Sequence, residues 1–325
     1  MEFRLDEEQQ GLQDTVRRFC AARFPSERIA ERCAEGVDRK AWRELAELGM
    51  FGVLTGDGRS TGGVALGAIV LEQLGAHLVN GPVMWSTLAA PYIDGAATGD
   101  RLVGGIADAD SDRDPIVVEH AGEIDALLLL RADGVYVCEA SELPRWQPLT
   151  PLDPLTPIGR CEALPRGVRV GDAAEASRVR MAGTVLCAAM LLGVSDGALE
   201  TSRRYALDRE QFGVPIGSFQ AVQHLLADMY VRTVLARSAT YAAAAVLDDP
   251  PVGDPLRASA AAKLLAGEAA LENARVAIQV HGGVGFTWEM LPNYLLKRAW
   301  VLENAFGDSN THAFSISASI EEALT

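Results

Sequence analysis

Arg209 could bind a phosphate group, because it stands where a predicted helix ends and a Gly-x-Pro turn begins. A guanidinium in this position can hold a phosphate through two parallel hydrogen bonds, and the main-chain N–H groups of Gln211 and Phe212 can add donors. The alternative is an ion pair of Arg209 with Asp208 or Glu210 on a solvated helix end. Taken alone, the stretch leaves both interpretations open.

Two adjacent glycines, Gly282 and Gly283, follow the end of another predicted helix. Glycine is the usual residue just beyond a helix C-terminus, so a C-cap explains one of them. Two neighbouring residues without Cβ atoms would also let a ligand lie directly on the main chain. His281 and Trp288 could contact such a ligand, but we expect both in the core. Together with Arg209, the pair could hold a dinucleotide.

The elements that must position these residues are predicted to be mostly helical. The chain has 325 residues, 49% of them hydrophobic but only 6% aromatic, a composition that favours helices. Asp6 and Gln9 form a capping box before the first helix, and apolar residues recur at helical spacing further on. Further helices are predicted over 39–48, 63–74, 183–208, 218–247 and 255–279.

A small β region separates the two helical parts. Apolar runs over 126–130 and 135–138 flank a turn signal at 132–134, which predicts a hairpin, and a proline-rich stretch follows over 144–157. The spacing of Asp108, Asp110, Asp112 and Glu119 imitates a calcium loop, but Arg113 stands where that loop needs glycine. We therefore expect a solvated acidic loop and no metal site. The glycine-rich stretch 56–63 lacks the lysine of a phosphate loop and reads as a turn.

The overall charge excludes some partners. The formal net charge of −15 repels phosphate backbones and anionic membrane surfaces, so we expect no nucleic-acid partner. Five scattered cysteines without a Cys-x-x-Cys pair predict neither a disulfide framework nor a zinc site, and they fit a reducing cytoplasm. The start of the chain has no apolar signal core, and no apolar run approaches 18 residues. We therefore expect neither export nor membrane insertion.

Two stretches resemble the signature of the acyl-CoA dehydrogenases. The first is Tyr-x-x-x-Arg-x-Gln-Phe-Gly-x-Pro-Ile-x-x-Phe-Gln over 205–220, and the second is Gln-x-x-Gly-Gly-x-Gly-Phe-Thr-x-Glu over 279–289. The first residues of the chain and the segment 42–49 are similar to the first helices of that family. The motifs occur in the family's order, and the resemblance covers nearly the whole chain. The protein is therefore identified as a member of this family.

The resemblance implies a mainly α fold in three parts: an N-terminal helical domain over 1–97, a small, reduced middle β domain over 98–178, and a C-terminal four-helix bundle over 179–325 through which subunits associate. It also implies an oxidoreductase. In this family a glutamate removes the α proton of an acyl-CoA thioester while hydride passes from the β carbon to FAD. The electrons then go to an electron-transfer flavoprotein.

In this family the FAD lies across a subunit interface. The resemblance implies that this chain reaches over to hold the pyrophosphate and adenosine of the FAD seated in the neighbouring subunit. The residues that match the family's binding positions are Arg209, Gln211, Phe212, Phe219, Gln220, Gln279, Gly282 and Gly283.

The chain departs from the family at the catalytic positions. The family's glutamate occupies one of two places, which here fall on Gly183 and Gly307. Asp308 is adjacent to the second place, but it is shorter and one residue out of register, so it is only a candidate base. The family's Thr-Glu-Pro-x-x-Gly-Ser-Asp segment, which contacts the flavin and the thioester, is replaced by the residues 106–112.

These observations leave three hypotheses. The first is a non-catalytic subunit of a heteromeric acyl-CoA dehydrogenase, a heterodimer or α2β2 heterotetramer with a paralogous catalytic subunit. It would resemble the paired actinobacterial subunits that act on steroid side-chain CoA thioesters. The second is a self-sufficient homo-oligomer that binds FAD and uses Asp308 or Asp196 as the base. The third is a flavin-free scaffold, which the presence of Arg209 and both glycines disfavours.

Overall fold

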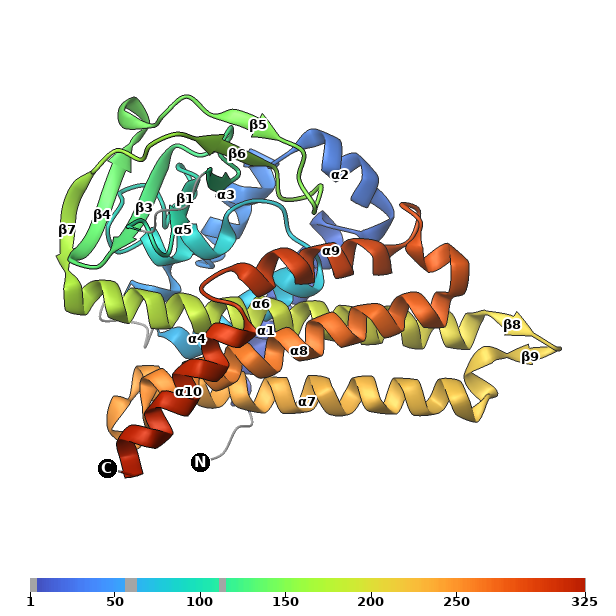
Figure 1. The fold of residues 1–325 in the computed structure, drawn as a ribbon. Helices are drawn as coiled ribbons and strands as arrows, with labels where there is room; N and C mark the ends of the chain where they lie inside the picture. Colours follow the sequence, from blue (N-terminus) through green and yellow to red (C-terminus); the bar gives the residue numbers. More distant parts are fainter. Residues whose placement is uncertain (1–4, 56–62, 111–114, 325) are drawn as a thin grey trace.

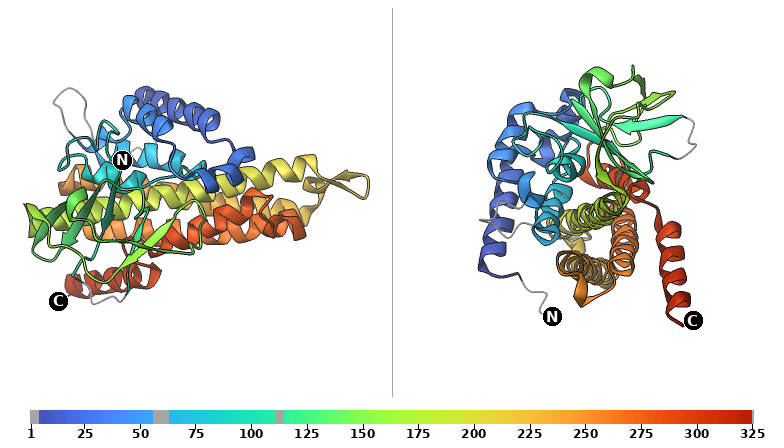
Figure 2. Two further views of the ribbon diagram at one scale, coloured as in Figure 1. Left: turned by 90° about the horizontal axis from the view of Figure 1, so that it is seen from above. Right: turned by 90° about the vertical axis from the view of Figure 1, so that its left-hand side faces the viewer.

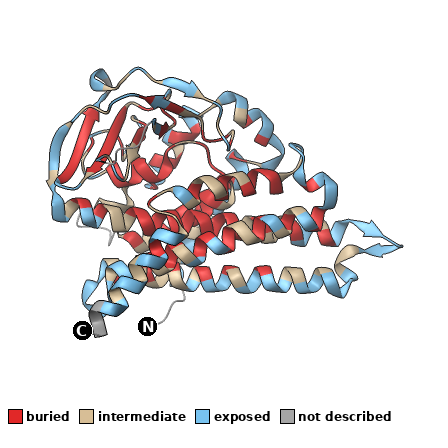
Figure 3. Cartoon of the chain, viewed as in Figure 1, coloured by how far each residue is buried: buried red, intermediate tan, exposed pale blue. Residues whose placement is uncertain are grey.

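The computed structural model describes residues 5–55, 63–110 and 115–324. Short helices and a small β region lie over one side of a set of long helices that run side by side (Figure 1). A hairpin projects beyond one end of the long helices, and the last helix lies on the outside of the bundle, in contact with the helix over 255–281 (Figure 2). Buried residues concentrate where these layers meet (Figure 3).

The N-terminal part consists of short helices packed on α4. The predicted capping box is confirmed: the Asp6 carboxylate accepts the Gln9 N–H at 2.8 Å, and the Asp6 N–H donates to the Gln9 side chain at 3.2 Å. On α3 the apolar face buries Trp42 and Leu45, as the spacing predicts. The helices are α1 (Glu7–Arg23), α2 (Ile29–Glu35), α3 (Arg39–Glu47), α4 (Val64–Ala76) and α5 (Val83–Ala89).

The β region contains two small sheets. One has the strand order β1-β3-β4-β7 and the other β2-β6-β5. The predicted hairpin is confirmed as the antiparallel pair β3–β4, whereas β1 and β3 are parallel. Alternate residues of β3 face two different cores, with Leu128 in one and Leu127 in the other, so the strand reads as a continuous apolar run. The strands are β1 (Val103–Ile106), β2 (Ile116–Glu119), β3 (Ala126–Arg131), β4 (Gly134–Glu139), β5 (Gln147–Leu149), β6 (Ile158–Cys161) and β7 (Val168–Asp172).

Helix α6 (Ala173–Asp208) is the central element of the fold. It begins ten residues before the predicted start, because the charged residues of its first turns hide the apolar periodicity, while the Asp172 side chain caps it by accepting the Glu175 N–H. An 18-residue window of α6 has a mean hydropathy of 1.6, but 78% of that window is buried inside the protein. It is therefore a core helix. At its crossing with α4, a Cβ on Gly193 would lie 2.0 Å from the Glu72 carbonyl oxygen, so the two helices can approach this closely only with glycine there.

The two helices predicted over 218–247 and 255–279 pack against α6 and end close to the predicted positions, whereas two shorter helices beyond residue 290 were not predicted. Three polar side chains inside this bundle bond one another: the Asn273 amide donates to the Ser195 hydroxyl at 2.8 Å and to the Thr233 hydroxyl at 3.0 Å, whereas the buried Thr240 hydroxyl has no described partner. Buried polar groups need such partners. These elements are the short strands β8 (Glu210–Gln211) and β9 (Val214–Pro215), then α7 (Gln220–Asp248), α8 (Pro255–His281), α9 (Leu291–Asn304) and α10 (Ser309–Leu324).

The acidic residues of the β region do not gather into an ion site. The Asp110 carboxylate accepts hydrogen bonds from Arg131 at 2.8 Å and from the Ala132 N–H at 2.7 Å, while Glu119 lies in β2. Across the described ranges no group of three or more His, Cys, Asp or Glu side chains could hold a metal. Asp112, Arg113 and most of the glycine-rich stretch 56–63 lie outside the described residues.

Candidate cofactor-binding and catalytic positions

Arg209 caps the end of α6 and directly precedes β8, the first strand of the projecting hairpin. Its main chain is fixed on both sides: the Arg209 N–H donates to the Tyr205 carbonyl at 2.8 Å, and the Arg209 carbonyl accepts the Ile216 N–H at 2.8 Å. Its guanidinium is exposed and makes no ion pair or hydrogen bond with any described residue. Neither Asp208 nor Glu210 pairs with it, so the ion pair considered as the alternative to phosphate binding is not observed.

The tip of the hairpin presents an exposed aromatic ring. Phe212 and Gly213 form the two-residue turn, with φ of 56° and 80°, as in the tight turns that suit a β-hairpin. A positive φ is unfavourable for a bulky residue, and the Phe212 side chain is 93% exposed. Its only described ring contact is edge-to-face with Phe219, at 6.2 Å between centroids. A strained backbone that places an aromatic ring in water points to a partner or ligand.

The glycine pair at the end of α8 faces open space. Gly282 has φ of 66° and donates its N–H to the Gln279 carbonyl, so a C-cap accounts for this glycine. Gly283 has no positive φ, and a Cβ built on it meets no atom within 4 Å. Nothing in the described chain therefore requires glycine at 283, although close approach of a ligand to the main chain would require it.

One ring contact joins the hairpin end of α6 to the glycine end of α8. Tyr205 and His281 stack with ring centroids 4.1 Å apart and an interplanar angle of 24°. His281 is buried, and burial lowers its pKa. All the predicted cofactor residues are exposed at this end of the molecule, namely Arg209, Gln211, Phe212, Phe219, Gln220, Gln279, Gly282 and Gly283.

His281 lies in the core as expected, but the same expectation for Trp288 is wrong. Trp288 is 56% exposed, because the short turn after Gly282 carries it beyond the end of α8. The Lys297 ammonium lies 4.8 Å from its ring centroid, a distance typical of a cation–π contact.

The two positions expected for the family's glutamate, Gly183 and Gly307, lie close together, and the Phe306 ring packs against Gly183. A Cβ on Gly183 would lie 2.2 Å from Cε1 of Phe306, the residue directly before Gly307. The Phe306 ring also stacks on Trp85, at 4.9 Å between centroids. Phe306 and Gly307 have φ of 57° and 97°, a turn that the buried Lys263 ammonium holds by donating to the carbonyls of Glu303 at 2.9 Å and Gly307 at 3.0 Å. The Phe306 ring leaves no room for a longer side chain at position 183.

The two aspartates considered as alternative bases have other contacts. Asp308 accepts hydrogen bonds from the Thr311 N–H at 2.8 Å and hydroxyl at 2.6 Å, and these bonds lower its pKa. It thereby caps the start of α10. Asp196 lies in another part of the fold, where its carboxylate accepts a hydrogen bond from Arg237 at 3.0 Å. The lowered pKa of Asp308 suits a helix cap more than a catalytic base, which must take up a proton.

Sequence reasoning missed Glu119 as a site residue. This half-buried carboxylate makes no hydrogen bond with the described residues, and burial raises its pKa. It lines a cavity of about 20 Å³ with Trp85 and Arg298, enough for a single water molecule. The Arg298 guanidinium bonds Asp153 at 2.5 Å and the Val79 carbonyl at 3.2 Å, but its Nη2 atom is buried without a partner. The cavity is too small to hold a flavin ring.

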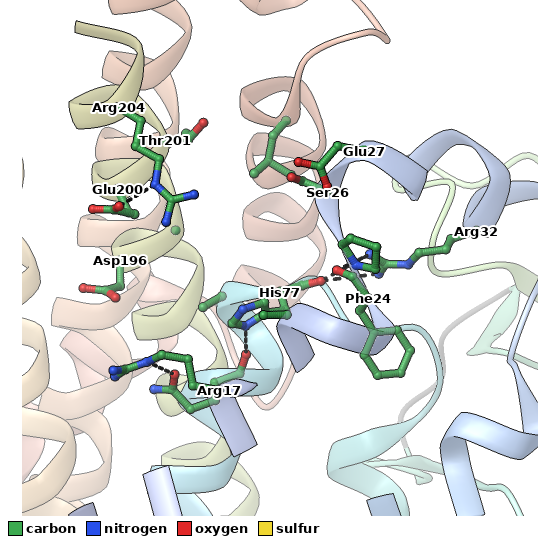
Figure 4. Close-up of a pocket in the computed structure, with 16 residues that line it drawn as sticks. Arg17, Phe24, Ser26, Glu27, Arg32, His77, Asp196, Glu200, Thr201 and Arg204 are labelled. Carbon is green, nitrogen blue, oxygen red and sulfur yellow. Dashed lines mark hydrogen bonds and ion pairs between the residues drawn. The ribbon is translucent and has the colours of Figure 1, made fainter. Parts of the chain in front are cut away.

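A separate hollow of about 420 Å³ lies between α1 and α6 (Figure 4). Its arginines have partners: Arg17 bonds Gln73 at 3.2 Å, and Arg204 bonds Glu200 at 2.6 Å. Arg32, which is buried, donates to the main-chain carbonyls of Phe24 and His77. Glu27 also lines the hollow and makes no hydrogen bond or ion pair with a described residue.

Comparison with known proteins covers almost the whole chain. Residues 6–99 match the family described as acyl-CoA dehydrogenase, N-terminal domain, and residues 180–321 match acyl-CoA dehydrogenase, C-terminal domain. The chain is 33% identical over 308 residues to the acyl-CoA dehydrogenase IpdE2 of Mycobacterium tuberculosis, covering 90% of this chain and 91% of IpdE2. It is also 33% identical over 331 residues to FadE34 of that organism, covering 93% of this chain but 46% of FadE34.

A solved structure agrees with these matches in fold. The crystal structure of the ChsE4-ChsE5 complex from Mycobacterium tuberculosis contains a chain that superposes with a TM-score of 0.85 at 26% identity, covering 99% of both chains.

Proposed function

Because this chain belongs to the acyl-CoA dehydrogenase family, we propose that it is a non-catalytic subunit that completes the FAD site of a paralogous catalytic subunit. The observation that carries the proposal is a contrast within one molecule. The cofactor-binding candidates are exposed and the Arg209 guanidinium has no partner among the described residues, whereas Phe306 fills the place beside Gly183 where the family's base would lie. A chain built in this way can contribute to a site on another subunit but has none of its own.

In the proposed complex this chain binds and orients the cofactor. Arg209 neutralises and holds the pyrophosphate, which its free guanidinium can do through two hydrogen bonds. Gly282 and Gly283 let the adenosine half lie on the main chain, and the Phe212 ring covers apolar surface of the cofactor or partner. FAD, when bound, accepts hydride from the β carbon of the acyl-CoA. The partner supplies the glutamate that removes the α proton and the contacts of the flavin ring.

The relatives support a paired arrangement. ChsE4-ChsE5 is a complex of two different chains, one of which is similar to this chain over nearly its full length. In FadE34 a segment similar to this chain makes up about half of a longer polypeptide, which leaves room for a second unit. We propose a heterodimer or α2β2 heterotetramer that oxidises an acyl-CoA in the cytoplasm, with a steroid side chain as the acyl group and electron-transfer flavoprotein as the electron acceptor.

The test is to express the chain alone and with its paralogous partner, and to measure FAD content and acyl-CoA oxidation. We expect no FAD and no activity for the chain alone, and both for the complex. In the complex, Arg209→Ala should lower FAD affinity, because a charge-assisted contact with the pyrophosphate is lost. The control is Arg203→Ala, which removes an exposed arginine that pairs with Glu200 near the same helix end. A flavin-loaded, active homo-oligomer of this chain would overturn the proposal, and unchanged FAD binding by Arg209→Ala would favour a flavin-free scaffold.

A further inference from the structure

The stacked rings of Tyr205 and His281 connect the two segments that carry the cofactor-binding candidates. Tyr205 lies one helical turn before Arg209, and His281 directly precedes Gly282. We propose that Tyr205 and His281 are positioning residues that set the spacing between the Arg209 loop and the glycine turn, an inference that rests on the function proposed above. The affinity of the complex for FAD depends on this stack although neither ring touches the cofactor.

On the α6 side, Tyr205 is coupled directly to the main chain of Arg209. Its carbonyl accepts the Arg209 N–H at 2.8 Å, and the Arg209 carbonyl in turn accepts the Ile216 N–H at 2.8 Å. A displacement of Tyr205 therefore shifts Arg209 and the returning strand of the hairpin together.

On the α8 side, His281 is fixed from two directions. Its Nδ1 atom lies 2.7 Å from the Ala277 carbonyl oxygen, so Nδ1 carries the proton and donates it to that carbonyl. A Cβ on Gly285 would lie 2.8 Å from Cβ of His281, which shows how closely the glycine turn folds back over this residue. Movement of the His281 ring is therefore transmitted to Gly282 and Gly283.

The aromatic ring of Tyr205, rather than its hydroxyl, makes the connection. The hydroxyl forms no hydrogen bond with any described residue, whereas the ring lies nearly parallel to His281 at contact distance. Aromatic pairs in such arrangements contribute beyond the area they bury. Phenylalanine at position 205 should preserve the spacing, and alanine should lose it.

The experiment measures the dissociation constant for FAD of the co-expressed complex, together with its melting temperature. Tyr205→Ala and His281→Ala should each weaken FAD binding about tenfold, which corresponds to about 1.4 kcal/mol at 25 °C. The double variant should be no weaker than either single variant, because both remove the same contact. Tyr205→Phe should bind FAD as the unsubstituted complex does.

A second stacked pair serves as the matched control. Trp42 and Phe51 stack at 4.3 Å in the N-terminal part, so Phe51→Leu should lower the melting temperature without changing FAD affinity. If Tyr205→Phe loses affinity, the hydroxyl contacts the cofactor and the positioning role is wrong. If Arg209→Ala weakens FAD binding while Tyr205→Ala and His281→Ala do not, only the positioning role fails. If Arg209→Ala also has no effect, the proposed function fails.

Discussion

The ring of Phe306 lies directly against Gly183 of the central helix, with Cε1 only 2.2 Å from the point where a Cβ would stand. The two residues are far apart in the sequence, and each marks or adjoins one of the family's two glutamate places. Their contact means that a carboxylate side chain at position 183 would overlap the Phe306 ring. A base restored at either place would still face an aromatic ring.

Substitution of Gly183 by alanine should destabilise the protein. The added methyl group would overlap the Phe306 ring, and overpacking of a core typically costs about 1–3 kcal/mol. Replacing the Phe306 ring by leucine should relieve this overlap. Gly183→Ala should therefore cost less free energy of unfolding in the Phe306→Leu background than in the unsubstituted protein. Urea unfolding monitored by circular dichroism gives the free energies for this cycle.

Gly11→Ala is the control for this substitution. Gly11 lies inside α1, and a Cβ there meets nothing within 4 Å, so alanine should stabilise the helix by about 0.5–1 kcal/mol. Equal effects of Gly183→Ala and Gly11→Ala would contradict the described contact with Phe306.

Replacing Lys263 by methionine should be strongly destabilising. Lys263 is fully buried, and its loss leaves the carbonyls of Glu303 and Gly307 without their donor and the Glu303 carboxylate without a nearby cation. Removal of one partner from a buried charged group typically costs about 3–5 kcal/mol. Lys40→Met, on an exposed position of α3, should change the free energy of unfolding by less than about 0.5 kcal/mol. A similarly small effect at Lys263 would show that the Phe306 turn does not depend on it.

Glu119→Gln should stabilise the protein at neutral pH. Burial raises the pKa of Glu119, so the folded state binds its proton more tightly than the unfolded state does. Stability is therefore lost as pH rises from the unfolded pKa, about 4.3, through the higher folded pKa. Glutamine carries no such penalty, so the advantage of the variant should shrink as the pH falls and vanish below about pH 4. The check is to measure the urea unfolding midpoints of the variant and the unsubstituted protein across this pH range. A difference between them that stayed the same at every pH would refute the prediction.

The protein should also lose stability as the pH falls through the histidine range. Burial lowers the pKa values of His77, His281 and His312, so the unfolded state takes up these protons first. The loss begins near the unfolded pKa of about 6.5 and continues until the lower folded pKa values are reached. His312→Gln should reduce the dependence, because it removes one titrating group. Unfolding curves at pH 7.5 and 5.5 that coincide for the unsubstituted protein would contradict this account.

The local features of the fold could be predicted from the sequence. The capping box at Asp6 and the hairpin around 132–134 follow from short-range rules, and the structure contains both. Helix ends near Arg209 and Gly282 are marked by a turn and by glycine, and they also occur as predicted. The start of α6 was missed because charged residues interrupt its apolar pattern.

The long-range relationships could not be predicted in this way. The sequence shows glycine at 183, but only the three-dimensional fold brings Phe306 against it. The burial of Lys263 and the exposure of Trp288 depend in the same way on which elements pack nearby. The sequence shows Glu119 only as part of an acidic spacing that imitates a calcium loop, and its missing hydrogen-bond partner and raised pKa are visible only in the fold. Periodicity indicates that a residue faces a core but does not tell which residue it meets there.

Helix α6 carries Gly183 near its start and Arg209 at its end, roughly 40 Å apart at 1.5 Å per residue. At this separation a substitution at one site leaves the packing of the other undisturbed. Under the proposed function, the chain can therefore lack a base near Gly183 and still hold the cofactor through Arg209.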